Sequence, residues 1–406
     1  MSYTSSVIVI PTRNRAALAR NAINSVLGQS DCEVNVLVSD NSTLTQQRTE
    51  LSQHCQQAPN RRLRYIVPPE PLPMSQHWDW AMRQALSLYD ASHVSFLTDR
   101  MMFKPDALKP LLDIVTAYPS KILTYMHDMV DDYQMPVIVR QYTWTGNLYE
   151  VPTRRLLELV AQSVMYDTAV PRMLNCLVPR RVLEAIRDRF GGFFASLSPD
   201  WNFAFRALEC EDSILFYDKG AMVHYAQDLS NGQSAHYGIE NEALTTFLQD
   251  IAGQPINNGS PFPEIATVWN GIISEYCLVK EITKSPKFPE LNLEEYMRVL
   301  AWGVEQMKNP ERRQRMREFL SARGWKYEEA RREQKDADGT ATKEELPAES
   351  ARQVEEFSVN AIEFQSRSTA LNYGLRSSRK RSAATNHQEL LHGVILKWTQ
   401  MEADEE

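Results

Sequence analysis

The sequence lacks the features that mark several classes of protein. No apolar run approaches the length of about 18 residues that suggests a membrane-spanning helix. The opening residues, MSYTSSVIVIPTRNR, lack the basic stretch that precedes the apolar part of a secretory signal. The five cysteines form no CxxC pair, so neither a disulfide framework nor a zinc site is indicated. We therefore expect a cytoplasmic protein with reduced cysteines, with peripheral contact at a membrane as the alternative.

The chain also lacks an excess of positive charge and the common glycine-rich phosphate loops. Its 52 acidic and 44 basic residues give a net charge of -8, which disfavours nonspecific binding to nucleic acid. The patterns GxGxxG and GxxxxGKS/T are both absent, so neither a dinucleotide fold of the usual kind nor a P-loop is supported. We expect no nucleic-acid partner.

The length of the chain indicates more than one compact core. Its 406 residues predict a domain at residues 1–285 and an appended region at 286–406. The appended region is highly charged, and we expect a helical, partly disordered extension with a linker near 333–350. Its last amphipathic stretch, HQELLHGVILKW, predicts one helix for homo-oligomerisation or for docking on a partner, with membrane-surface contact second.

Short β-branched runs alternate with helical patterns in the first hundred residues. Four such runs predict strands at residues 6–10, 34–38, 64–67 and 94–97. Strands separated by helices pair in parallel, and ligands bind beyond the carboxyl ends of such strands. The turns after Ile10, Val38 and Leu97 are therefore the places where we expect chemistry.

The first turn, PTRNR, offers donors for an anion. We expect Pro11 to end the strand. Thr12, Arg13 and Arg15 place hydroxyl and guanidinium groups at the start of a helix, where the helix dipole also favours an anion. Two solvated arginines on a surface turn are the simpler interpretation of the same residues.

The second and third turns, SDNST and TDR, each carry a single acid. Asp40, Asn41 and Ser42 follow a buried strand, where they cap a helix or hydrogen-bond a base and a ribose. Asp99 ends an apolar run, where a carboxylate usually has a positively charged partner, and Arg100 follows it.

Together the three turns resemble those of the inverting family 2 glycosyltransferases with the GT-A fold. The resemblance covers roughly residues 5–235 and includes PMSQHWDWAMRQAL, which is similar to the family's helix before its metal motif. It implies an α/β fold in which a mostly parallel sheet is flanked by helices. By the same resemblance, the nucleotide is bound by Pro11, Thr12, Arg13, Arg15, Asp40 and Ser42.

The chain departs from this family at the metal motif. Family members usually place two or three acids there, because Mg²⁺ or Mn²⁺ needs oxygen ligands that bridge it to the diphosphate. Here Asp99 is the one acid, between Thr98 and Arg100. Either Asp99 holds the cation with diphosphate and water oxygens, or Arg100 neutralises the diphosphate and the cation is weak or dispensable. An ion pair between Asp99 and Arg100 is the purely structural alternative.

The second half of the resemblance supplies a base and a second metal ligand. The stretch SLSPDWNF is similar to the family's Glu-Asp-Trp-Asp stretch and implies that Asp200 is the catalytic base, with Pro199 where glutamate is commoner. Asp200 also fits the N-cap of the helix that follows, and Glu211 and Asp212 are the reserve candidates. His224 follows a predicted strand, and the resemblance implies that it completes the metal shell with Asp99. An ordinary structural histidine is the alternative there.

The resemblance to this family implies an enzyme of polysaccharide biosynthesis. We expect inverting transfer of a hexosyl group from a nucleotide-sugar donor to a hydroxyl of a carbohydrate or lipid-linked acceptor, because displacement at the anomeric carbon needs a base for the acceptor's proton. A non-catalytic nucleotide-sugar-binding or scaffold protein with a degenerate metal motif is the alternative. A GT-A nucleotidyltransferase is disfavoured, since its glycine-rich opening loop is missing.

Overall fold

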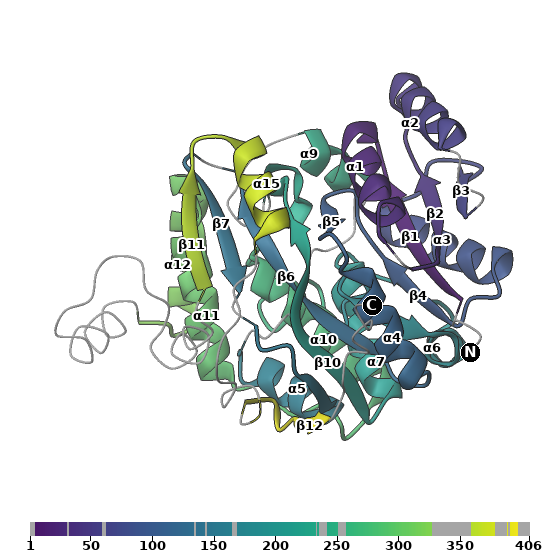
Figure 1. Ribbon diagram of the computed structural model, residues 1–406. Helices are drawn as coiled ribbons and strands as arrows, with labels where there is room; N and C mark the ends of the chain where they lie inside the picture. The colour runs from purple at the N-terminus through teal and green to yellow at the C-terminus, as the bar shows by residue number, and fades with distance from the viewer. Residues whose placement is uncertain are drawn as a thin grey trace. The chain divides into compact units, whose positions relative to one another are not determined.

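The computed structural model divides into two compact units (Figure 1). The described residues are 5–30, 32–58, 62–133, 135–142, 144–164, 169–232, 234, 242–250, 257–326, 359–377, 388 and 390–396. Unit 1 comprises Met1–Arg155, Asp167–Gln227 and Val359–Glu406, and unit 2 comprises Leu156–Tyr166 and Asp228–Ser358. The predicted boundary after residue 285 coincides with no limit of either unit, and the predicted linker near 333–350 lies outside the described residues.

Unit 1 is built on one large sheet. The strands described are β1 Ser6–Thr12, β2 Val34–Asp40, β3 Leu63–Ile66, β4 His93–Phe96, β5 Met101–Phe103, β6 Leu123–Asp131, β7 Val137–Tyr142, β8 Leu148–Pro152, β9 Cys176–Pro179, β10 Ser213–His224, β11 Val359–Phe364 and β12 Val394–Leu396. Along the sheet they follow the order β12-β8-β10-β6-β9-β4-β1-β2-β3, and β5, β7 and β11 pair off this path. The four strands predicted from β-branched runs are therefore confirmed as β1 to β4.

The sheet is mixed rather than mostly parallel. β1 pairs in parallel with β2 and β4, β2 with β3, and β6 with β10. β9 lies antiparallel between β4 and β6, so it joins the two parallel groups. The carboxyl ends of β1, β2 and β4 lie at one edge, and the ends of β6 and β10 share an edge in the same way.

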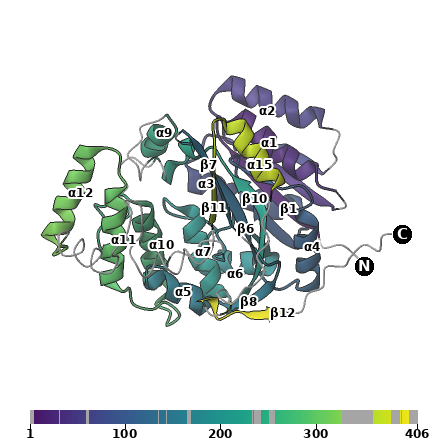
Figure 2. The same cartoon turned by 60° about the vertical axis from the view of Figure 1, so that its left-hand side comes forward.

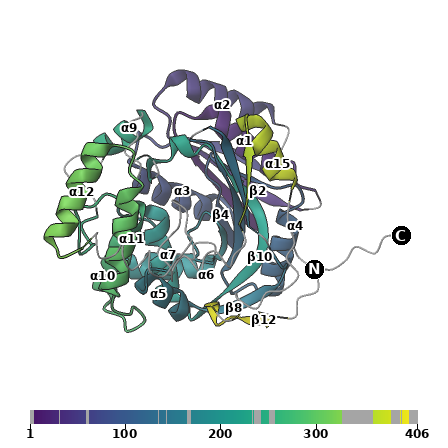
Figure 3. The same cartoon turned by 90° about the vertical axis from the view of Figure 1, so that its left-hand side faces the viewer.

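Helices cover both faces of this sheet. The helices described are α1 Ala16–Leu27, α2 Thr45–Gln57, α3 Met74–Leu88, α4 Leu108–Ala117, α5 Thr153–Ala161, α6 Arg180–Phe190, α7 Pro199–Cys210, α9 Glu242–Asp250, α10 Val268–Thr283, α11 Leu293–Glu305, α12 Pro310–Ala322 and α15 Arg367–Arg376, with the short 3-10 helix η1 Gln227–Leu229. In unit 1, α4 and α15 lie on one side of the sheet and α3, α6 and α7 on the other (Figures 2 and 3). The predicted α/β class, a central sheet flanked by helices, is confirmed.

The end of the chain differs from the expected helical extension. α11 and α12 confirm the predicted helices after residue 285, but β11 pairs antiparallel with β7 and β12 pairs antiparallel with β8. The predicted helix at HQELLHGVILKW is wrong for Val394–Leu396, because these β-branched and apolar residues extend the edge of the sheet instead. Among the described helices, none combines the length and the apolar content needed to cross a membrane.

The described part of unit 2 is helical, and local sequence signals explain where its helices begin. The side chains of Thr267, Asn292 and Asn309 accept hydrogen bonds from backbone N–H groups in the first turns of α10, α11 and α12, respectively. Pro310 occupies the first turn of α12, where its missing N–H costs nothing.

Candidate active site

The first and third turns meet at Asp99. Thr12 Oγ1 donates a hydrogen bond to Asp99 Oδ2 at 2.8 Å, and Arg15 Nη1 lies 3.5 Å from Asp99 Oδ1. Asp99 is buried, so these two contacts replace part of its lost hydration. The expected ion pair between Asp99 and its neighbour Arg100 is not formed within the described chain, since Arg15 takes this place.

The polar groups of the second turn are bonded to one another and to neighbouring residues. Asp40 is fully buried, and its carboxylate accepts hydrogen bonds from the Ser42 backbone N–H at 2.9 Å and from the Tyr65 hydroxyl at 2.7 Å. Ser42 Oγ in turn accepts from the backbone N–H of Asn14 at 2.8 Å. Tyr65 was not among the predicted site residues, although its place on β3, opposite Val38 and two positions from Asp40 in the parallel register, follows from the strand pattern.

Pro11 has a different position from that expected, and Arg13 acts on a histidine of α3. Pro11 lies inside β1, which ends at Thr12, so it does not end the strand as predicted; it is aligned with Ser39 of β2. The positive charge of Arg13 acts on His77 of α3: burial, and then Arg13, lower the pKa of His77 to about 3. His77 therefore stays neutral at physiological pH, where its Nε2 lies 2.8 Å from Ser39 Oγ.

Arg100 is a half-buried guanidinium among charges of both signs. Burial, and then the like charge of Arg15, lower the pKa of Arg100 to about 10, while Asp99, Asp132 and Asp200 act in the opposite direction. Within the described part of the chain, its buried Nη1 has no hydrogen-bond acceptor. A buried cationic N–H without an acceptor is costly, so this position fits an anionic ligand.

Asp200 lies in the first turn of α7, behind Ser198 at the N-cap and Pro199. It is therefore inside the helix rather than at the cap itself. Burial raises the pKa of Asp200, opposed first by Arg172, then by hydrogen bonds from the Trp201 and Asp200 backbone N–H groups, and then by Arg100. Part of the residue nevertheless remains accessible to solvent. A partly accessible carboxylate with a raised pKa has the character of a general base.

Glu211, one of the reserve candidates, has a structural partner. Both oxygens of its buried carboxylate accept hydrogen bonds from Arg181, at 2.8 and 2.7 Å. This bidentate pair accounts for its charge at the C-terminal end of α7, where Glu211 is the capping residue. Asp212 follows it, and its backbone carbonyl accepts a hydrogen bond from the Thr153 N–H.

His224 is the last residue of β10 and faces the same charges. Burial, followed by Arg100, His127 and Arg172, lowers its pKa well below the usual value, so the imidazole is neutral. Its Nε2 is buried and accepts or donates no hydrogen bond among the described residues. The centroid of its ring lies 6.1 Å from that of His127.

The predicted metal ligands do not form a metal site by themselves. In the ranges that the structure describes, no cluster of three or more His, Cys, Asp or Glu side chains has the geometry to hold a metal ion. Asp99 is already bonded to Thr12 and Arg15, and a guanidinium beside a carboxylate opposes the approach of a second cation. The family's usual cation therefore does not fit these residues as a protein-held group.

Arg172 is a site residue that the sequence did not single out. Its guanidinium carbon lies 5.3 Å from the centroid of the Trp201 ring, next to Asp200 on α7. Its charge lowers the pKa values of both Asp200 and His224. No motif marked it, because it precedes β9 in a loop without regular spacing.

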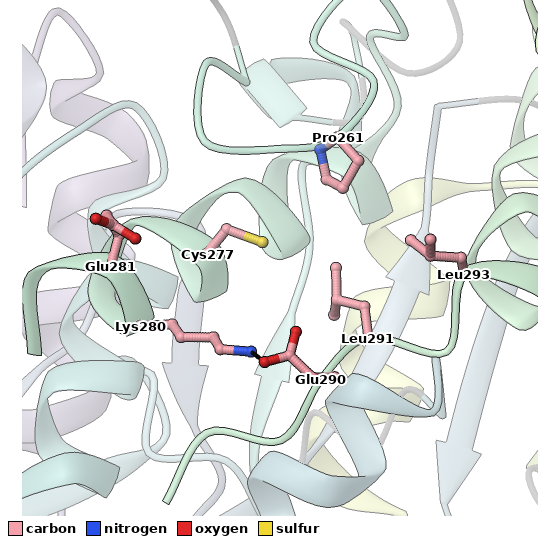
Figure 4. A pocket seen from close by; sticks show the side chains of 7 residues that line it. All are labelled: Pro261, Cys277, Lys280, Glu281, Glu290, Leu291 and Leu293. Carbon is pink, nitrogen blue, oxygen red and sulfur yellow. Dashed lines mark ion pairs between the residues drawn. The ribbon is translucent and has the colours of Figure 1, made fainter. Parts of the chain in front are cut away.

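A pocket in unit 2 contains none of the predicted residues. Figure 4 shows its lining side chains, which include Cys277, Leu291 and the ion pair of Lys280 Nζ with Glu290 Oε1 at 2.6 Å. It offers one already neutralised charge pair and no cluster of reactive groups.

Solved structures of other proteins are similar to this chain over 76% of its length. The fold is similar to the crystal structure of S. aureus TarS 1-349, with a TM-score of 0.41 and 15% sequence identity over 76% of this chain and 82% of that chain. The complex of the same S. aureus fragment with UDP-GlcNAc gives a TM-score of 0.43 and 14% identity over the same shares of the two chains. No curated protein matches the sequence.

The family match covers the turns described above. Residues 7–161 match the model of the family described as Glycosyl transferase family 2, and this range contains Thr12, Arg15, Asp40, Asp99 and Arg100. The protein is thus a glycosyltransferase, and its residues 7–161 form a domain of glycosyl transferase family 2.

Proposed function

We propose that this glycosyltransferase is an inverting enzyme that moves a hexosyl group from a nucleoside-diphosphate sugar to a hydroxyl of a carbohydrate or lipid-linked acceptor. The observation that carries the proposal is the position of Arg100. Its buried Nη1 lacks an acceptor within the described chain, and it lies close enough to Asp99 and Asp200 for both carboxylates to affect its pKa. A cation with a free N–H near two acids suits a reaction in which negative charge leaves on one side and a proton is removed on the other.

In the proposed mechanism, Arg100 binds the departing diphosphate. A guanidinium presents its N–H donors as a rigid fork that matches phosphate oxygens. Arg15 holds Asp99, so the carboxylate of Asp99 does not compete for Arg100. Preorganised charge at the leaving group is commonly the largest single contribution to such catalysis.

The nucleotide half of the donor is assigned to the first two turns. We propose that Pro11, Thr12, Arg13, Arg15, Asp40 and Ser42 line this part of the site. The hydrogen bonds of Asp40 with Ser42 and Tyr65 support a turn that is already in its final shape before the donor arrives. Preorganisation of this kind lowers the entropy cost of binding.

Asp200 acts as the general base in this proposal. The acceptor oxygen attacks the anomeric carbon, the bond from that carbon to the diphosphate oxygen breaks, and Asp200 takes the acceptor's proton. The raised pKa of Asp200 makes its carboxylate a stronger base than an exposed aspartate. Attack from the side opposite to the diphosphate inverts the configuration at the anomeric carbon.

The family's divalent cation has a minor place in this mechanism. No step depends on it, because Asp99 and His224 are the only two predicted ligands and Arg15 occupies Asp99. Arg100 supplies the counter-charge that a cation provides in relatives with more acids at this turn.

The stereochemical course tests the proposal directly. The purified chain is incubated with UDP-, GDP-, CDP-, ADP- and dTDP-sugars, with water as the surrogate acceptor, and the released sugar is followed by proton NMR before mutarotation. We expect one α-linked donor to give the β-anomer first. Release of the α-anomer first would contradict an inverting mechanism, and release of no sugar with tight nucleotide binding would support a binding protein.

A further inference from the structure

The C-terminal segment 359–377, more than 190 residues beyond the family match, folds back onto the ends of β6 and β10. β11 pairs with β7 along its whole length, and α15 follows directly (Figure 1). Gly374 of α15 approaches the sheet so closely that a Cβ there would lie 3.5 Å from Val223, the neighbour of His224. The segment is therefore packed against the strand that carries a predicted site residue.

Both ends of α15 are bonded to buried groups of the sheet. At its C-terminal end, the Ser377 carbonyl accepts a hydrogen bond from Lys104 Nζ at 2.9 Å, and Lys104 also pairs with buried Asp128 at 2.6 Å. At its N-terminal end, Arg367 Nε lies 2.9 Å from Asp132 Oδ2, and Arg367 Nη2 donates to the Asp132 carbonyl at 3.0 Å. Attachment at both ends fixes the helix in position and in rotation.

Asp132 connects this helix to the turn after His224. Its side chain is completely buried, and its two carboxylate oxygens accept hydrogen bonds from the backbone N–H groups of Ala226 at 2.9 Å and Gln227 at 2.7 Å. Ala226 has a φ of 52°, a left-handed conformation that a residue with a Cβ adopts only when its surroundings hold it there. The neighbouring Tyr225 N–H donates to the Arg100 carbonyl at 3.0 Å, so the same turn also supports Arg100.

The charges explain why this attachment matters for Arg100. Asp132 lies near enough to Arg100 to affect its pKa. Arg367 forms an ion pair with Asp132, and this pair reduces the hold of Asp132 on Arg100. Without Arg367, this buried carboxylate would lose a neutralising charge, and its attraction for Arg100, whose pKa it already raises, would be opposed less.

We infer that Arg367 is a positioning residue of the transferase site, which acts through Asp132 to hold the turn 225–227 and to keep Arg100 directed at the ligand. The expected effect of Arg367 on catalysis rests on the proposed function. Its effect on the turn 225–227 does not. It makes the C-terminal segment a part of the active site's framework, although the segment lies outside the matched family domain.

The test uses the full-length chain and compares Arg367→Ala and Arg367→Lys with Arg376→Ala. Arg376 is exposed on the same helix and takes part in no ion pair among the described residues, so it is a matched control. Hydrogen–deuterium exchange of the peptide that contains Ala226 and Gln227 reports the turn without any ligand. We expect at least about tenfold faster exchange of these amides in Arg367→Ala, with Arg367→Lys intermediate and Arg376→Ala unchanged.

The functional part is read from nucleoside-diphosphate affinity and donor turnover in the same variants. We expect Arg367→Ala to lower kcat/KM by about tenfold or more, because small misplacements of a positioned group are expensive. In an Arg100→Met background the same change should have almost no further effect on kcat/KM, since Arg367 acts through Arg100. Losses of turnover that simply multiply in the double variant would indicate general destabilisation and overturn the inference.

The outcomes separate this inference from the proposed function. Unchanged exchange of the 226 and 227 amides in Arg367→Ala overturns the inference, whatever the chain catalyses. Faster exchange with unaltered nucleotide affinity and turnover overturns the link to Arg100. If the wild-type chain binds no nucleoside diphosphate and cleaves no donor, the proposed function fails, and the positioning role at a transferase site fails with it, while the exchange data still decide whether Arg367 holds the turn.

Discussion

Two acidic turns at the same edge of the sheet differ in how completely their polar groups are satisfied. After β2, the carboxylate of Asp40 is fully buried and has two internal hydrogen-bond donors. After β4, Asp99 is held by Thr12 and Arg15, but the adjacent Arg100 keeps a buried N–H without an acceptor among the described residues. The polar groups of the turn with Asp40 are satisfied without a ligand, whereas those of the turn with Asp99 and Arg100 need a ligand to be satisfied.

This difference separates a turn that stabilises the fold from a turn that binds a ligand. A buried polar group that lacks a partner raises the free energy of the ligand-free protein, and a ligand that supplies the partner recovers it. The turn with Asp40 has no such deficit to recover. Substitutions at the two turns should therefore act on different observables, catalysis at Arg100 and stability at Asp40.

The largest effect is expected at Arg100. Arg100→Met removes the proposed counter-charge of the diphosphate and should lower kcat/KM by about 10²–10³-fold, the loss typical of one preorganised donor at a developing charge. Arg100→Lys keeps the charge without the fork and should be intermediate. Steady-state kinetics of donor cleavage measure both, and a loss below about threefold in Arg100→Met would make this turn structural like its neighbour.

Asp200→Asn should lower kcat at least about a hundredfold while leaving nucleoside-diphosphate affinity nearly unchanged. The amide keeps the shape of the side chain in the first turn of α7 but cannot accept the acceptor's proton. Calorimetric titration and donor turnover on the same preparation give the two values. A parallel loss of affinity and turnover would assign Asp200 to the framework.

Arg172→Gln should change the pH dependence more than the maximal rate. The base must be deprotonated, so the rate falls as the pH drops through the pKa of Asp200, which burial raises and Arg172 lowers. Removing Arg172 therefore moves this acid limb to higher pH. The pH profile of kcat checks the shift against Arg187→Gln, a change at a surface ion pair of α6; an unmoved limb would mean that Asp200 does not control it.

Tyr65→Phe should have the smallest effect on catalysis and a visible effect on stability. It removes one of the two donors to the buried carboxylate of Asp40, which costs about 1–3 kcal/mol. We expect a lower Tm with nucleotide affinity preserved within about threefold. Tyr89→Phe, whose hydroxyl bonds the neutral Val36 carbonyl at 3.3 Å, is the control. An unaltered Tm with tenfold weaker binding would mean that the Tyr65 hydroxyl serves the ligand rather than the stability of the fold.

The sequence predicts the part of the fold that local patterns determine. β-branched runs and helical spacing correctly predict β1 to β4 and the helices α1 and α3 between them, because neighbouring residues determine these elements. They do not predict that β11 joins β7 or that Val394–Leu396 forms a strand, since such pairings depend on edges made by distant segments.

The site is predictable to a similar extent. The family resemblance proposes Asp99 and Asp200, because these residues follow a strand or open a helix in recognisable stretches, and Arg100 is proposed because it follows Asp99 where the chain departs from the family. It does not predict Arg15 as the partner of Asp99, and no local signal connects Arg367 with Asp132, which are 235 residues apart. Contacts of that kind arise from the tertiary fold alone.

The most direct test of Arg100 as the counter-charge is a calorimetric titration of the wild-type chain, Arg100→Met and Asp99→Ala with a panel of nucleoside diphosphates, each in EDTA and in Mn²⁺. The account predicts that one nucleoside diphosphate binds the wild-type chain with a Kd that chelation changes by less than about threefold, and that Arg100→Met weakens it by at least about 1.4 kcal/mol, or tenfold. Binding that requires Mn²⁺ and disappears in Asp99→Ala, with Arg100→Met unaffected, would contradict it.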